Sequence, residues 1–177
     1  MRETSQLPGI SDMAVYLPRY SIESSEIVTA RTKEDAANGE RLVRALEYTG
    51  QRSIRFTDGY EDSATMAAEA ARRLVRQRPE ALDGLRYLAT GTETGLDHSK
   101  PLASWVQGML NKDGMRVPGS VVTSQTQHAC AGGTIALLGT AAQLVAGGRA
   151  NERGLVVCTD IARYKRASTA EITQGAG

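Results

Sequence analysis

The sequence contains few of the residues from which metal sites, disulfide frameworks and nucleotide-binding loops are built. Its 177 residues include two cysteines, two histidines, one tryptophan and one phenylalanine. Two cysteines do not form a disulfide framework, so we expect free thiols in a reducing, cytoplasmic environment. Neither histidine has the partners of a zinc site, and the phosphate-binding patterns GxGxxG and GxxxxGK[ST] are missing. We therefore expect no metal and no resident cofactor.

Charge of one sign and long apolar runs are also scarce. The net charge is +1, which gives no electrostatic case for nucleic acid or an anionic membrane as partner. The first residues lack the pattern of a signal peptide, and we expect no apolar run of the roughly 18 residues that span a membrane. Two basic clusters are interpreted as solvated faces, with a docking patch for a phosphate-bearing ligand or acidic carrier as the alternative: Arg72, Arg73, Arg76 and Arg78; Arg163, Lys165 and Arg166.

Alternating apolar patterns and turn residues predict an α/β layered domain with a parallel sheet. The length is that of one domain. The apolar run of residues 153–162 is typical of a strand that is covered on both faces. Strands are predicted at 9–18, 85–93, 119–125 and 153–162, and helices at 62–79, 99–110 and 129–148, with two short helices on either side of Asn38-Gly39.

Two candidate catalytic residues follow strands of this predicted sheet, where open parallel sheets bind their ligands. Cys130 begins an apolar helix, whose unpaired first-turn amides stabilise a thiolate. Gly132 and Gly133 leave the backbone open to a substrate carbonyl, so nearby amides can hold an oxyanion. The alternative is that Cys130 is a buried structural cysteine. Cys158, in the middle of a strand, is interpreted as structural.

Residues 85–93 run from a strand into a glycine-containing loop, and Glu93 lies just past the strand proper, 85–90, in the loop "GTETGLD". A carboxylate at that edge, next to an apolar helix, is suited to proton transfer, although a solvated loop carboxylate is the alternative. His128 precedes Cys130 by two positions, a spacing that rarely gives a Cys–His ion pair. His98 is interpreted as a surface residue.

Five short motifs together resemble the 3-hydroxy-3-methylglutaryl-CoA synthase family. They occur in the family's order over nearly the whole chain: "YLPRY" (16–20), "GTETGLD", "HACAGGT", "TDIARY" (159–164) and "TQGAG" (173–177). "ACAGGT" and "GTETGLD" are particularly similar to the relatives that install β-methyl branches on polyketides. The resemblance implies a thiolase-type layered βαβ fold made from two similar halves, of which residues 1–177 would be the N-terminal half.

The resemblance also assigns roles to individual residues. Cys130 matches the nucleophile that accepts an acetyl group from a thioester, and Glu93 matches the acid/base that produces the enolate. This enolate adds to the ketone of a β-ketoacyl thioester, and water then releases the product. Thr173 matches a substrate-contacting threonine. The substrates would be acetyl-CoA or thioesters of an acyl carrier protein, which is then a further partner.

Two departures from the family pattern stand out. Ala131 follows the cysteine where the family usually has a larger residue, which implies a wider acyl pocket. The family's downstream catalytic histidine has no counterpart here, so we expect a split synthase in which a second chain supplies the C-terminal half and the histidine, within an oligomer. A truncated or cleaved protein would look the same. The alternatives in function are a ketosynthase, which needs no carboxylate at Glu93, and a non-catalytic half that stabilises an active partner.

Overall fold

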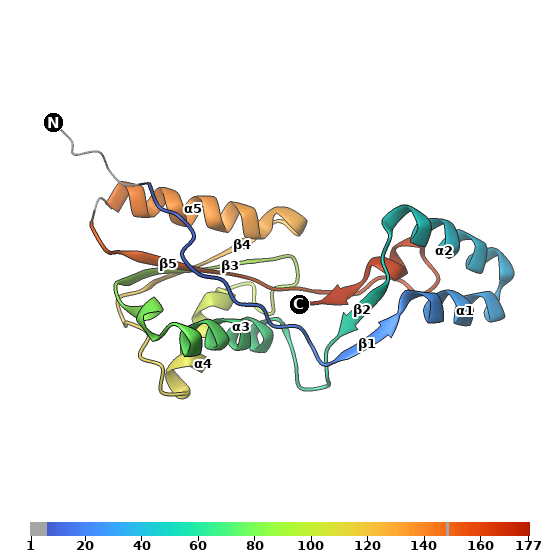
Figure 1. Cartoon of the computed structure of the whole chain (residues 1–177), viewed down its shortest axis with the longest axis horizontal. Helices are drawn as coiled ribbons and strands as arrows, with labels where there is room; N and C mark the ends of the chain where they lie inside the picture. Colours follow the sequence, from blue (N-terminus) through green and yellow to red (C-terminus); the bar gives the residue numbers. More distant parts are fainter. Residues whose placement is uncertain (1–6, 148) are drawn as a thin grey trace. The chain divides into compact units, whose positions relative to one another are not determined.

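The computed structural model describes residues 7–147 and 149–177, and their contacts divide them into two compact units (Figure 1). Each unit is assembled from segments that are separated in the sequence. Unit 1 comprises the N-terminal segment up to Tyr16 together with Ser63–Thr159, and unit 2 comprises Leu17–Asp62 and Asp160–Gly177.

Unit 1 is built around a three-stranded parallel sheet, as the sequence predicts. The strand order is β4-β3-β5, so β3 lies in the centre. In chain order the elements are α3 (Ser63–Gln77), the 3-10 helix η1 (Pro79–Leu82), β3 (Leu85–Thr92), α4 (Leu102–Lys112), β4 (Val122–Gln127), the 3-10 helix η2 (Ala129–Ala131), α5 (Gly132–Gly147) and β5 (Arg153–Cys158).

The helices of unit 1 lie on opposite faces of the sheet, with α3 and α4 on one face and α5 on the other (Figure 1). The core lies on the α3–α4 side, where Leu88 of β3 and Val106 of α4 are completely buried. Small side chains on α3, such as Ala67 and Ala71, let α4 approach closely. This face therefore holds the hydrophobic core of unit 1.

The strand predicted at residues 9–18 is wrong, because this segment is extended but makes no strand pairing. Side chains of α3 and of Arg78, the residue just after it, hold its first part instead. Arg78 forms an ion pair with Asp12 at 3.0 Å, and Arg73 donates a hydrogen bond to the Val15 carbonyl and lies over the Tyr16 ring. Two arginines of the first basic cluster therefore fasten the N-terminal segment.

Unit 2 combines a helix pair with two short antiparallel pairs of strands. Its core contains Val28, Leu42 and Ile172. The strand β1 pairs with β2, and β6 pairs with β7. The elements are β1 (Tyr20–Glu23), α1 (Ser24–Glu34), α2 (Ala36–Thr49), β2 (Ser53–Phe56), β6 (Ile161–Ala162), the 3-10 helix η3 (Thr169–Thr173) and β7 (Gly175–Ala176).

The break between α1 and α2 lies at Asp35, and not at Asn38-Gly39 as predicted. The Asp35 carboxylate accepts a hydrogen bond from the Ala37 N–H at 3.0 Å and so caps α2. Gly39 lies inside α2, where a Cβ would overlap Thr32 of α1. This glycine thus serves close helix packing, and it does not form a turn.

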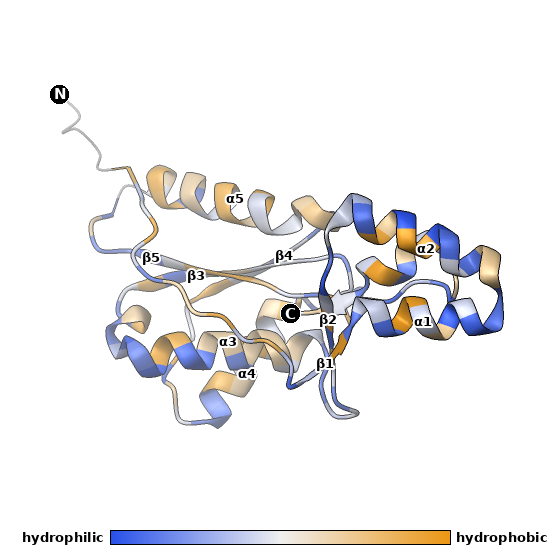
Figure 2. Ribbon diagram, turned by 45° about the vertical axis from the view of Figure 1, so that its right-hand side comes forward, coloured by the Kyte–Doolittle hydropathy of each residue, from blue (hydrophilic) through white to orange (hydrophobic). Residues whose placement is uncertain are grey.

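The helix α5 is apolar nearly all round but is buried along one side only, which its composition did not predict. Gly132, Ala136 and Thr140 are buried, whereas Ile135, Leu138 and Val145 are exposed. Figure 2 shows the pale to orange colours of α5 along most of its length.

The expectation of no membrane-length run is also wrong, since Ala129–Gly147 has the required length and a mean hydropathy of 1.5. Helices of protein cores meet the same test, so the length and hydropathy are weak evidence that this helix crosses a membrane.

Candidate functional site

The loops that follow β3 and β4 diverge to opposite faces of the sheet. The last residue pair of these neighbouring strands is Thr92 with Gln127. Beyond it, the chain leaves β3 for α4 on one face and leaves β4 for α5 on the other (Figure 1). Parallel sheets bind ligands where neighbouring strands lead to opposite faces, because a crevice opens between the two loops. Glu93 and Cys130 both follow this pair, one on each loop.

Cys130 lies in η2, the short turn that joins β4 to α5. Its thiol is free and exposed, so the alternative of a buried structural cysteine is wrong. The turn is held by a hydrogen bond from the Ala131 N–H to the His128 carbonyl at 2.9 Å. Ala129 has a φ of 33°, outside the regions that L-residues favour. Cys130 therefore lies two residues before the first residue of α5, in a turn with a fixed backbone.

Glycines at the start of α5 allow the helix to lie directly on the central strand. A Cβ on Gly91 of β3 would overlap the backbone of Gly133, and a Cβ on Gly132 would lie 3.1 Å from the Thr126 carbonyl oxygen. A Cβ on Gly133 would overlap the Cys158 sulfur. The glycines after Cys130 thus have a packing role. Oxyanion binding by the amides of Gly132 and Gly133 stays a prediction.

Cys158 is exposed, although its place in an apolar strand predicted a buried residue. It is the last residue of β5, which forms one edge of the sheet, and its partner in register is Gly91. Since Gly91 also lies against Gly133, the second thiol of the protein is near the start of α5. It belongs to the same end of the sheet as Cys130.

Glu93 is half-buried in the loop between β3 and α4. The residue after it is fixed from two sides. The Thr94 N–H donates a hydrogen bond to Thr92 Oγ1 at 3.0 Å, and its carbonyl accepts one from Ser63 Oγ at 3.0 Å. Ser63 is 1% exposed and begins α3. Neither Ser63 nor Thr92 stood out in the sequence, because a serine at a helix start is usually a simple cap.

The two histidines do not complete a catalytic group with Cys130 in this chain. His98 and His128 are both exposed, and in the part of the chain that the structure describes no hydrogen bond joins His128 to Cys130. Over residues 7–147 and 149–177, no cluster of His, Cys, Asp and Glu has the geometry of a metal site. The donor atoms near Cys130 therefore do not fit a metal ion.

Thr173 belongs to unit 2, where it is the last residue of η3. It is exposed, and its hydroxyl donates a hydrogen bond to the Ala170 carbonyl at 2.8 Å. An ion pair between Arg31 of α1 and Glu171 fixes this turn, with Nη2 and Oε1 2.7 Å apart. Hydrogen bonds from Arg31 and from the Ala167 N–H hold the pKa of Glu171 below its ordinary value, against the opposing effect of burial.

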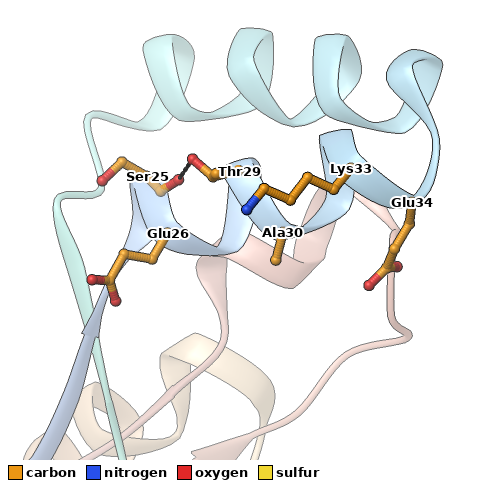
Figure 3. A pocket seen from close by; sticks show the side chains of 6 residues that line it. All are labelled: Ser25, Glu26, Thr29, Ala30, Lys33 and Glu34. Atoms are coloured by element: carbon orange, nitrogen blue, oxygen red, sulfur yellow. Dashed lines mark hydrogen bonds between the residues drawn. The ribbon is translucent and has the colours of Figure 1, made fainter.

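An open groove of unit 2 runs along α1 (Figure 3). A hydrogen bond from Thr29 Oγ1 to the Ser25 carbonyl, 2.8 Å long, lies within it. One helix supplies all of its lining residues: Ser25, Glu26, Thr29, Ala30, Lys33 and Glu34. It contains none of the predicted site residues.

Comparison with known proteins gives the family. The sequence pattern described as "Hydroxymethylglutaryl-coenzyme A synthase N terminal" matches residues 5–177. The chain belongs to the hydroxymethylglutaryl-CoA synthase family. Its relatives include the hydroxymethylglutaryl-CoA synthase of Haloferax volcanii, which is 30% identical over 88% of this chain, and that of Saccharomyces cerevisiae, which is 27% identical over 96%.

Solved structures of hydroxymethylglutaryl-CoA synthases have the same fold. One is MvaS in complex with 3-hydroxy-3-methylglutaryl coenzyme A, with 38% identity and a TM-score of 0.79 over 96% of this chain. Another, the curacin biosynthetic pathway HMG synthase in complex with holo donor-ACP, is 22% identical with a TM-score of 0.75 over 95% of this chain. The predicted thiolase-type layered fold is thereby confirmed.

The chain spans only part of these relatives. It covers 36% of the Haloferax protein, 32% of the yeast protein and 38% of the MvaS chain. About a third of a hydroxymethylglutaryl-CoA synthase is therefore represented, and this third includes Glu93 and Cys130.

Proposed function

We propose that this chain supplies the acyl-accepting part of an HMG-CoA synthase-type enzyme, in which Cys130 and Glu93 carry out successive steps. The proposal rests on one observation above all: both residues follow the last pair of β3 and β4, where the chain diverges to opposite faces of the sheet. Membership of the hydroxymethylglutaryl-CoA synthase family supports it.

In the first step, Cys130 receives the acetyl group. Its thiolate attacks the thioester carbonyl, the new carbon–sulfur bond forms, and the thiol of the donor leaves with a proton. The exposed position of Cys130 just before α5 suits this step, because the substrate must reach the sulfur. The N–H groups of Ala131 and Gly132 donate hydrogen bonds within the η2 turn, so other backbone amides beside Cys130 would have to stabilise the oxyanion.

In the second step, Glu93 removes a proton from the methyl group of the acetyl-enzyme. The enolate carbon attacks the ketone of a β-ketoacyl thioester, and the ketone oxygen takes up a proton. Water then cleaves the bond to Cys130, which yields a free carboxylate and restores the thiol. A thioester helps because its methyl protons are more acidic than those of an oxygen ester. Holding both partners in one crevice provides the orientation.

The remaining part of the fold, including a catalytic histidine, would come from a second chain or from further residues of the same polypeptide. The exposed apolar side of α5 supports this, because soluble proteins seldom leave such a face uncovered. The outer edge of β5 supports this proposal as well. Among the described residues β5 pairs with β3, and no strand pairs with its other edge.

The presence of Glu93 bears on the alternative functions. A decarboxylating ketosynthase is disfavoured, because it has no need of Glu93. A non-catalytic chain that stabilises an active partner stays an alternative. The motifs "ACAGGT" and "GTETGLD" favour polyketide β-branching, in which an acyl carrier protein delivers the thioester. Presenting the acetyl group on CoA and on a carrier protein, in parallel, distinguishes the two donors by their transfer rates.

The proposal is tested by mass spectrometry of the active assembly after incubation with acetyl-CoA. We expect one acetyl group on Cys130 in the wild type and none in Cys130→Ala. Glu93→Gln should accept acetyl normally but lose condensation by about 100-fold or more, because only proton removal needs the carboxylate. Condensation is followed by mass spectrometry of the acceptor thioester, which gains the acetate unit as a free carboxylate while its own thioester bond stays intact.

Cys158→Ala is the matched control, since it removes the other thiol and should leave acetylation in place. The role of Cys130 is excluded if the acetyl group is found elsewhere. Normal condensation by Glu93→Gln would exclude the carboxylate as the base.

A further inference from the structure

The loop that carries Glu93 needs support from outside itself. Residues 93–101 form neither helix nor strand between β3 and α4. A base that removes a proton from a bound acyl group must be held to within a fraction of an ångström, because small misplacements greatly slow proton transfer. The elements packed around this loop therefore decide how well Glu93 works.

Gln125 of β4 fixes the far end of the loop. Its Oε1 accepts a hydrogen bond from the Leu102 N–H at 2.7 Å. Leu102 is the first residue of α4, where backbone N–H groups have no partner within the helix. The Gln125 side chain is half-buried, so this bond is protected from competition with water. The carboxamide thus determines where the loop ends and α4 begins.

The same carboxamide lies against the middle of the loop. A Cβ on Gly95 would stand 2.7 Å from Gln125 Nε2, so the glycine backbone packs directly on the amide. Any larger residue at position 95 would push the carboxamide aside. Gly95 is the second glycine of "GTETGLD", and its small size is explained by this contact.

Ser63 holds the near end of the loop through its hydrogen bond to the Thr94 carbonyl. Ser63 is itself fixed, because its own carbonyl accepts a hydrogen bond from Thr159 Oγ1 at 3.1 Å. Glu93 lies between β3 and these two supports. The residue that follows it, Thr94, is held by hydrogen bonds to Thr92 and Ser63, which limits where the Glu93 backbone can lie.

We infer that Gln125, together with Ser63, is a positioning residue for Glu93, an inference that rests on the proposed role of Glu93. Gln125 holds the loop through Gly95 and Leu102 and acts on the reaction only through Glu93. Loss of its carboxamide should slow removal of the methyl proton and leave acetyl transfer to Cys130 intact. A general loss of structure would slow both steps together.

The test compares Gln125→Met with the wild type in the active assembly. Methionine keeps the size of the side chain but removes the hydrogen-bonding groups. With acetyl-CoA deuterated in its methyl group, we expect acetyl transfer within about twofold of wild type and deuterium loss to water slowed at least about tenfold. Gln125→Glu retains the acceptor for Leu102 and should recover most of this rate. Gln107→Met removes a carboxamide that binds the Pro118 carbonyl, far from Glu93, and should change neither rate.

Amide hydrogen exchange of this chain gives a second measurement that does not need activity. Leu102 should be protected in the wild type and exchange rapidly in Gln125→Met. If the wild type accepts no acetyl group, the proposed function is wrong, and exchange at Leu102 alone then decides whether Gln125 holds the loop. Deuterium loss at the wild-type rate, equal slowing of both steps, or unchanged protection of Leu102 would each overturn the inference.

Discussion

At the scale of single residues, the site depends on glycines that bring backbone against backbone. Gly91 and Gly133 touch where α5 begins, and neither position has room for a Cβ. The sequence suggested that the glycines after Cys130 admit a substrate. The structure adds that these glycines let the start of α5 pack directly on β3. This role depends on a contact between residues distant in the sequence, which no local pattern reveals.

This contact predicts opposite effects for two glycine-to-alanine substitutions. Gly91→Ala should lower the free energy of unfolding by about 3 kcal/mol, because its Cβ meets the rigid backbone of Gly133. Gly139 lies on the open side of α5, where nothing is within 4 Å of an added Cβ. Gly139→Ala should therefore raise the free energy of unfolding by about 1 kcal/mol. Urea denaturation of the two variants measures both. Equal effects at both positions would contradict the close approach.

At the scale of elements, the salt bridge between α1 and η3 gives unit 2 a pH-dependent component of stability. The Glu171 side chain is 5% exposed, and Arg31, at 17%, donates hydrogen bonds to both of its oxygens. Glu171 is further fixed by the Ala167 N–H at 2.7 Å. The ion pair therefore secures the turn that ends in Thr173.

The lowered pKa of Glu171 sets the direction of the pH effect. Its folded-state pKa lies below the ordinary value of 4.5, so its stabilising contribution is present above that pH and is lost as the pH falls through the folded-state pKa. Arg31→Met should cost about 3 kcal/mol at pH 7, because it leaves a buried carboxylate without its cation. The variant should also lose less stability than the wild type on acidification.

Urea denaturation at several values of pH below 7 measures this dependence. Arg41→Met is the matched control, since Arg41 is exposed and bonds only to the Asn38 side chain in the described part of the chain. It should change stability by less than about 0.5 kcal/mol. Parallel pH profiles for the wild type and Arg31→Met would contradict the role of the pair.

Most elements were predictable because their patterns are local. The parallel strands, α3 and α4 follow from apolar periodicity, although Pro101, expected in the first turn of the helix, is the residue just before α4. The strand at 9–18 was wrong because alternation shows that a segment can pair and does not show that a partner exists. The helix break at Asp35 was missed because Asn-Gly was taken as the stronger turn signal.

The site was predictable in part for the same reason. Glu93 and Cys130 follow strands whose ends the sequence indicates, and the structure places both beyond the pair Thr92–Gln127. Ser63 and Gln125 were not predictable, since each acts on a loop that is distant in the sequence. The exposure of Cys158 was missed because composition alone does not reveal that β5 is an edge strand.

At the scale of the whole molecule, α5 exposes a stripe of apolar side chains on the surface of unit 1. Leu138 is 64% exposed, and Ile135 and Val145 are 41% and 43% exposed. Three to four residues separate neighbours in this stripe once Ala142 is included, so it runs along one side of the helix. An exposed stripe of this kind is typical of a surface that another polypeptide covers.

The stripe predicts how the chain behaves in solution. We expect Leu138→Lys to keep the folded stability within about 0.5 kcal/mol, because the residue packs little within this chain. The same change should reduce self-association of the chain alone and prevent assembly into an active enzyme. Size-exclusion chromatography with light scattering measures the first effect, and product formation measures the second. Gln143→Lys, also exposed on α5, should alter neither.

The η2 turn that holds Cys130 continues directly into α5, so Cys130 and the exposed apolar side of this helix belong to one continuous segment. A polypeptide that bound the outer side of α5 would therefore contact the helix from which the turn of Cys130 extends. We expect such binding to change the reactivity of the Cys130 thiol.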